Sequence, residues 1–177
     1  MSEIKKKNVL ITGGASGIGK LMCRMCLEQG AAKVIIWDLN LKAMEETAAE
    51  FAKLGKVYYY KVNVSDAKDI ANAYEKTKEE AGYVDILINN AGIVKGNETF
   101  DKQKVSDIQL TMDVNATAPM LVALEILPDM MMRNSGHICN IASAAGMLGV
   151  PRLSVYCASK WAVAGWTESL RIELKQA

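Results

Sequence analysis

Residues 9–19 read Val9-Leu10-Ile11-Thr12-Gly13-Gly14-Ala15-Ser16-Gly17-Ile18-Gly19. The apolar triplet at the start predicts a buried strand, and the glycines directly after it predict a turn that opens a helix. Such a turn lets the backbone approach a pyrophosphate, which the free N–H groups and positive dipole end of the helix attract. Because ordinary tight turns also use glycine, the position after the first strand carries this interpretation.

The rest of the chain repeats an apolar run, a turn and a helical segment. The further apolar runs are 34–37, 57–60, 84–88 and 137–141, and the helical segments are 17–29, 40–54, 66–81, 104–133 and 154 onward. Caps at Asn40, Ser65 and Ser154 support three helix starts. Near-continuous apolar runs are typical of parallel strands covered on both faces. The pattern predicts one α/β domain over residues 1–177, a doubly wound, Rossmann-like parallel sheet with helices on both faces.

The composition excludes some classes of function. A formal net charge of +1 over 177 residues gives no general attraction to nucleic acid or to anionic lipid. We find no signal sequence and no membrane-spanning segment, so we expect a cytoplasmic protein. We expect it to bind neither nucleic acid nor a membrane. Cys23 and Cys26 form a C-x-x-C inside a predicted helix. No second cysteine pair or histidine cluster completes a metal site, so we interpret both thiols as packing residues and expect no metal.

Asp38 ends the second apolar run, nineteen residues after Gly19. An acidic side chain at this position would accept hydrogen bonds from an adenosine ribose and would repel a 2′-phosphate. Neither Ser16 nor Leu39 supplies a compensating cation. The sequence therefore predicts NAD rather than NADP as cofactor, with an ordinary loop aspartate as the alternative.

Tyr156 and Lys160 lie four residues apart, and Ser143 precedes the tyrosine by thirteen residues. Positions i and i+4 share one helix face, so a phenol and an ammonium can point the same way. A nearby cation favours the ionised form of a phenol, which suits it to proton transfer. Together with the glycine turn, this spacing predicts an enzyme that transfers hydride.

Five motifs in this order resemble the classical short-chain dehydrogenases/reductases. They are the 12–19 turn, Asn89-Asn90-Ala91-Gly92, Asn115 within Asp113-Val114-Asn115-Ala116, Ser143, and Tyr156 with Lys160. The resemblance covers essentially the whole chain. It implies that the cofactor contacts Gly13, Ser16, Gly17, Ile18, Gly19, Asp38, Leu39, Asn63, Val64, Asn90, Ala91, Gly92, Tyr156 and Lys160.

The resemblance also implies a catalytic tetrad of Asn115, Ser143, Tyr156 and Lys160. In the family's pattern the tyrosine exchanges a proton with the alcohol or ketone, and the lysine holds the nicotinamide ribose. The serine orients the substrate oxygen, and the asparagine anchors a water in a proton relay. Many members have aspartate where this chain has Asn63, whose carboxamide oxygen can still accept from the adenine amino group.

The substrate is less sharply indicated. The segments 37–38, 142–146 and 150–151 are similar to the branch that acts on retinol, steroids and other lipid-like alcohols. Met147, Leu148, Val150 and Leu153 would either wall an apolar pocket or only pack their loop. The family also implies a homodimer or homotetramer, to which Trp161, Val163, Trp166 and Leu170 would contribute unless they pack inward.

Residues 171–177 continue a helical pattern without a capping glycine. The family has further strands after this helix, and one of them would cover the fifth strand. We therefore expect the complete protein to extend beyond this chain, with a natural short form as the alternative. The main hypothesis is an NAD-dependent alcohol dehydrogenase or ketone reductase. The alternative is a catalytically silent protein that binds a dinucleotide or a partner.

Overall fold

The computed structural model describes residues 3–176 and contains a five-stranded sheet in the order β3-β2-β1-β4-β5. The strands are β1 Asn8–Thr12, β2 Lys33–Asp38, β3 Lys56–Lys61, β4 Ile86–Asn89 and β5 His137–Asn140. β1 pairs in parallel with β2 and with β4, and β2 pairs in parallel with β3. The predicted Rossmann-like α/β fold is confirmed.

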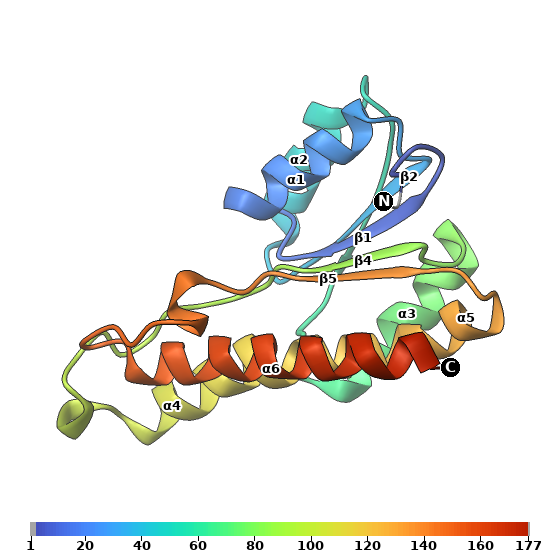
Figure 1. Ribbon diagram of the computed structural model, residues 1–177. Coiled ribbons are helices and arrows are strands. Elements are labelled where there is room, and N and C mark those ends of the chain that lie inside the picture. The colour runs from blue at the N-terminus through green and yellow to red at the C-terminus, as the bar shows by residue number, and fades with distance from the viewer. Residues whose placement is uncertain (1–2, 177) are drawn as a thin grey trace. The chain divides into compact units, whose positions relative to one another are not determined.

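Helices cover both faces of the sheet. The helices are α1 Gly17–Glu28, α2 Leu41–Phe51, α3 Ala67–Ala81, α4 Val105–Met112, α5 Ala118–Met132 and α6 Ser154–Gln176. Figure 1 shows α1 and α2 on one face, and α3 with the later turns of α5 on the other. Val9, Leu10 and Ile11 of the central strand β1 are fully buried as a result, as expected for a strand covered on both faces.

The chain divides into two compact units. The first comprises the residues up to Ala91 together with Leu121–Cys139, and the second comprises Gly92–Met120 and the residues from Asn140 onward. In the second unit, α4 lies beside α6 (Figure 1). That residues 1–177 form a single domain stays a prediction.

Two of the predicted helix caps can be checked directly. Asn40 caps α2 as expected, because its side chain accepts a hydrogen bond from the Ala43 N–H at 3.1 Å. The predicted cap at Ser65 is wrong, since Asp66 Oδ1 accepts from the N–H groups of Lys68 and Asp69 in the first turn of α3. The Ser65 hydroxyl instead donates to Asn63 Oδ1 at 2.8 Å, a local turn that the sequence pattern does not distinguish from a cap.

The helix predicted over residues 104–133 changes its geometry midway. α4 leads into one π-helical turn, η2 Asp113–Thr117, and α5 follows at Ala118. Isolated π turns are frequent at functional sites. Asn115 lies at the middle of this turn.

The same segment is long and apolar enough to cross a membrane, which the sequence prediction excluded. Val105–Met132 forms 28 helical residues, and 44% of its most apolar stretch is buried. Scattered polar side chains interrupt the apolar residues of this segment, so the sequence shows no unbroken apolar run there. A helix in the core of a protein can have the same length and composition, so this segment is not assigned to a membrane. The cytoplasmic location stays a prediction.

The C-x-x-C thiols are free and buried on α1. Burial raises the pKa of Cys23 to about 12, and the pKa of Cys26 is also raised by burial. Since the thiolate is the reactive form, we expect iodoacetamide at about pH 8 to leave both thiols unmodified in the folded protein. Peptide mass spectrometry measures the labelling, and protein unfolded in urea serves as the labelled control. Rapid labelling of Cys23 under native conditions would contradict the structural role.

Candidate functional site

The glycine turn of the first unit has little room for side chains. Gly13 has φ +64°, and its N–H donates to the Trp37 carbonyl at 2.7 Å. A Cβ on the buried Gly19 would lie 2.1 Å from the Gly13 carbonyl oxygen. Gly17 has φ +51° but faces open space. The turn therefore needs glycine at position 19 for its own packing, and it leaves space at position 17.

The N-terminus of α1 lies at that open side. Ser16 precedes the helix in an extended conformation, is exposed, and makes no side-chain capping hydrogen bond. Ile18 in the first turn is 67% exposed. The first N–H groups of the helix and its dipole are thus accessible to an anion, so Ser16, Gly17 and Ile18 fit a bound pyrophosphate.

Hydrogen bonds between Thr12 and the segment at Asn90 connect the ends of β1 and β4. The Thr12 hydroxyl accepts from the N–H groups of Asn90 and Ala91, both at 3.0 Å. Asn90 Nδ2 donates to the Thr12 carbonyl at 2.9 Å and to the Gly13 carbonyl at 3.2 Å. The amide of Asn90 therefore shapes the turn. The sequence analysis quoted Thr12 only as part of the motif and assigned it no role.

Asp38 lies at the end of β2, as predicted, and also supports the turn. Its Oδ2 accepts from the Ala15 N–H at 3.1 Å, and its Oδ1 accepts from the Asn40 N–H at 3.0 Å. A carboxylate has about four lone-pair sites, so two remain for a ribose. The neighbouring Leu39 is 61% exposed. These residues fit the adenosine end of a dinucleotide.

Asn63 and Val64 follow β3. Asn63 Oδ1 accepts from both the N–H and the hydroxyl of Ser65, and Val64 is 9% exposed. The carboxamide oxygen expected to meet an adenine amino group is thus engaged by Ser65.

In the second unit, Tyr156 and Lys160 share one face of α6. Lys160 is 5% exposed, its Nζ donates to the Ile141 carbonyl at 2.8 Å, and it lies 5.9 Å from the centroid of the Tyr156 ring. Burial lowers the pKa of Lys160, because a charged ammonium is poorly solvated there. Tyr156 is half-buried. The predicted pairing of phenol and ammonium is thus present.

Ser143 precedes a short 3₁₀ turn, η3 Ala144–Gly146, that packs against α6. Its Oγ accepts from the Ala145 N–H at 3.1 Å, which orients the hydroxyl and leaves its proton free to donate. A Cβ on Gly146 would lie 2.9 Å from the Lys160 carbonyl oxygen, so glycine permits this close packing.

Asn115 is 1% exposed and binds the loop after β4 through both ends of its amide. Its Oδ1 accepts from the Ile93 N–H and its Nδ2 donates to the Ile93 carbonyl, both at 2.8 Å. Nδ2 also donates to the hydroxyl of Ser159 at 3.2 Å. Both amide protons are therefore used within the protein. The sequence analysis did not identify Ile93 or Ser159, although Ser159 lies between Tyr156 and Lys160 in the chain.

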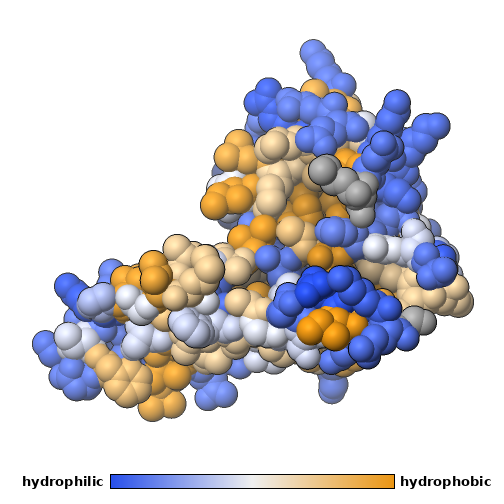
Figure 2. All heavy atoms as spheres, in the orientation of Figure 1, coloured by the Kyte–Doolittle hydropathy of each residue, from blue (hydrophilic) through white to orange (hydrophobic). Residues whose placement is uncertain are grey.

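Two loops of this unit expose apolar side chains. Met147 and Leu148 are 72% and 64% exposed, and Val94 and Phe100 are 52% and 65% exposed. Figure 2 shows orange side chains at the loop end of this unit, on the left. The Met147 and Leu148 side chains are therefore accessible from solvent, and an apolar wall formed by this loop stays a prediction.

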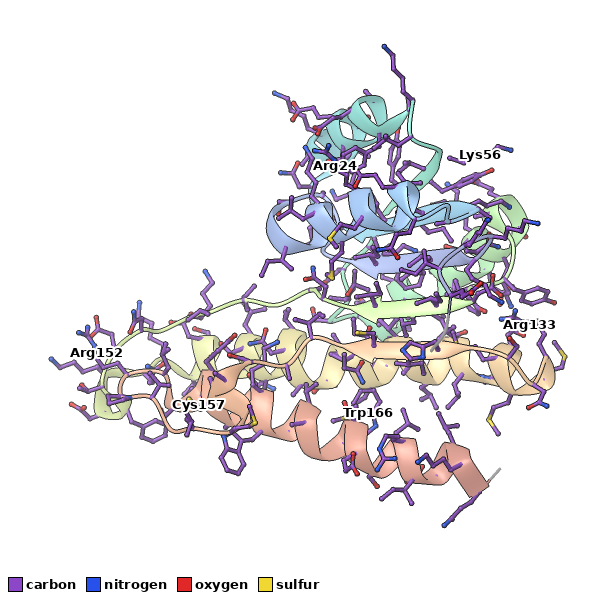
Figure 3. The ribbon with its side chains drawn as sticks, turned by 45° about the horizontal axis from the view of Figure 1, so that its top comes forward. Arg24, Lys56, Arg133, Arg152, Cys157 and Trp166 are labelled. Carbon is purple, nitrogen blue, oxygen red and sulfur yellow. The ribbon has the colours of Figure 1, made fainter. Side chains whose placement is uncertain are left out.

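An arginine connects the two loops. Arg152, labelled in Figure 3, donates to the Asn97 carbonyl at 3.2 Å and lies 3.6 Å from the Glu98 carboxylate. The pair is exposed, so it contributes little to stability. It nevertheless links the segment after η3 to the segment after β4.

The structure therefore groups the predicted residues in two sets. The first unit carries Gly13, Ser16, Gly17, Ile18, Gly19, Asp38, Leu39, Asn63, Val64, Asn90 and Ala91, and the second carries Gly92, Asn115, Ser143, Tyr156 and Lys160. That these residues bind a cofactor and carry the catalysis stays a prediction.

Comparisons with known proteins identify the family. A family model described as short chain dehydrogenase matches residues 7–177. The chain is 42% identical over 176 residues to estradiol 17-beta-dehydrogenase 11 of Rattus norvegicus, an alignment that covers 96% of this chain and 58% of the rat protein. The chain thus spans little more than half the length of this curated relative.

Solved structures of the same fold hold both nicotinamide cofactors. A short chain dehydrogenase/reductase from Burkholderia phymatum in complex with NAD has a TM-score of 0.94 and 29% identity, over 99% of this chain and 63% of that chain. A metagenomic short-chain oxidoreductase in complex with NADP has a TM-score of 0.93 and 28% identity, over 99% and 79%. With the sheet order and the motif residues described above, these matches show that the chain belongs to the short-chain dehydrogenase family of oxidoreductases.

Proposed function

We propose that the protein transfers hydride between NAD(H) and a hydrophobic secondary alcohol or ketone. One observation carries the proposal: a buried Lys160 ammonium lies beside Tyr156 on α6. Burying a charged group costs free energy. A buried ammonium beside a phenol is therefore typical of a functional site, where the charge stabilises an ionised partner.

The roles of the residues follow from their chemistry. Tyr156 exchanges a proton with the substrate oxygen, and the charge of Lys160 stabilises the phenolate that forms. Ser143, whose oxygen already accepts from Ala145, donates its proton to the substrate oxygen and orients it. Asn115 holds the loop at Ile93 in place. The nicotinamide, when bound, accepts or supplies the hydride.

The apolar loops support a hydrophobic substrate. Met147, Leu148 and Val94 expose large apolar surfaces in the unit that carries Ser143 and Tyr156. Covering such surface with a steroid- or retinoid-like molecule is favourable by about 25 cal/mol per Å². The rat relative is named for estradiol, which is a molecule of this kind.

The cofactor choice is proposed from Asp38. A carboxylate at the end of β2 would repel the 2′-phosphate of NADP. We expect Asp38→Asn to raise the ratio of kcat/KM with NADP to kcat/KM with NAD about tenfold. This change corresponds to about 1.4 kcal/mol in the free-energy difference between the two cofactors. Nicotinamide absorbance measures both values.

Asp66→Asn is the matched control for that change. It removes one charge from the same unit and keeps a good capping side chain on α3. An equal change of cofactor preference in both variants would rule out a specific role for Asp38.

α6 also supports the proposal of a homodimer or homotetramer. Trp161 is 54% exposed and Ile172 is 47% exposed, whereas Val163 packs inward. Trp166 and Leu170 are half-buried. Helix α6 thus retains an apolar surface, which is typical of an interface.

The experiment that tests the proposed function is turnover of the full-length protein. Nicotinamide absorbance is followed with a panel of hydrophobic secondary alcohols and ketones, with NAD(H) or NADP(H). Turnover establishes the oxidoreductase and ranks its substrates. NADH binding without turnover across the panel would favour the catalytically silent alternative, and the absence of binding would refute the cofactor assignment.

A further inference from the structure

Ser159 joins two catalytic candidates through one buried hydroxyl. The residue is fully buried on α6. Its Oγ donates to the Tyr156 carbonyl at 2.7 Å and accepts from Asn115 Nδ2 at 3.2 Å. The hydroxyl therefore uses both its proton and a lone pair.

The second of these bonds distinguishes Ser159 from an ordinary helix serine. Helical serines commonly donate to a carbonyl one turn earlier, which requires no partner outside the helix. Here the acceptor side of the hydroxyl is occupied by an amide from η2. A continuous series of hydrogen bonds thus runs from Ile93 through Asn115 and Ser159 to the backbone of Tyr156.

We propose that Ser159 is a positioning residue that sets the orientation of the helical turn bearing Tyr156 and Lys160 relative to Asn115. The inference rests on the proposed oxidoreductase function. Without the hydroxyl, one N–H of the buried Asn115 amide has no partner. An unpaired buried N–H costs free energy, so we expect the Asn115 side chain to shift toward another acceptor. Displacements of about 1 Å at a catalytic group lower rates by about a hundredfold.

Thr167 provides a matched control on the same helix. Its hydroxyl donates to the Val163 carbonyl at 2.6 Å and accepts from Asn140 Nδ2 at 2.9 Å. The bonding pattern is that of Ser159, but the asparagine and the carbonyl belong to no candidate catalytic residue. A purely structural contribution of such a hydroxyl would affect the two sites alike.

The test compares Ser159→Ala with Thr167→Ala in the full-length protein, using the best substrate of the panel. We expect Ser159→Ala to lower kcat about tenfold or more, with KM and the NADH dissociation constant within about twofold of wild type. Thr167→Ala should keep kcat within about twofold. Ser159→Thr, which retains the hydroxyl, should recover most of the lost kcat.

Amide hydrogen exchange at Ile93 supplies a readout that does not depend on turnover. We expect this amide to exchange about fivefold faster in Ser159→Ala, because the Asn115 acceptor is held less firmly. Thr167→Ala should leave the exchange of Ile93 unchanged.

The outcomes separate the two ideas. If the wild type turns over substrate but Ser159→Ala behaves like Thr167→Ala in kcat, Ser159 has no positioning role. Unchanged exchange at Ile93 would equally overturn the proposal. If the wild type itself lacks turnover, the proposed function fails and the positioning role fails with it, whatever the exchange of Ile93.

Discussion

Tyr156→Phe should lower kcat by about 10²–10⁴-fold, the range for loss of a general acid or base. The change removes one hydroxyl from a half-buried ring, so the packing of α6 and the position of Lys160 should persist. NADH affinity should stay within about threefold of wild type, since a proton-transfer group acts in the transition state. Nicotinamide absorbance gives kcat, and fluorescence titration gives the dissociation constant.

Tyr59→Phe serves as the control for that variant. Tyr59 is a half-buried tyrosine on the edge strand β3, far in sequence from the candidate catalytic residues. It should retain full activity. If Tyr156→Phe kept more than about half of the wild-type kcat, Tyr156 would not be the proton-transfer group.

Gly19→Ala should lower the free energy of unfolding by about 2 kcal/mol or more, because overpacking of this kind forces backbone shifts. Its Cβ would lie 2.1 Å from the Gly13 carbonyl oxygen and 2.6 Å from Asn90 Nδ2. Relief requires opening the turn, so NADH binding should be lost as well. Urea denaturation measures the stability, and fluorescence titration of the remaining folded protein measures the binding.

Gly165→Ala is the same chemical change at a position with the opposite expectation. Gly165 lies within α6, and nothing stands within 4 Å of an added Cβ. Alanine there should raise the free energy of unfolding by about 0.5–1 kcal/mol, because glycine is a poor helix former. Equal effects at positions 19 and 165 would show that the turn tolerates a side chain.

The alternation of apolar runs and helical segments was enough to predict the sheet and most helix positions. Each β1 residue from Val9 to Ile11 is apolar because both faces of its strand are covered, and that requirement is local to the strand. The Tyr156–Lys160 pair was predictable for a similar reason. Residues four apart on a helix share a face in any tertiary context.

Other features depend on residues distant in the chain. The hydrogen bond between Thr12 and Asn90 joins residues 78 positions apart in the sequence, and the bond between Asn115 and Ser159 joins residues 44 positions apart. The sequence shows that a polar side chain can form hydrogen bonds. Its partner depends on which distant segments the fold brings together. The sequence therefore identified the chemical groups of the candidate site and the helix that carries Tyr156. Only the folded chain determined that the Asn90 amide bonds the backbone of the glycine turn, and that Ser159 connects Asn115 to Tyr156. Asn115 and Ser159 are buried, so their polar groups find partners within the protein rather than in solvent.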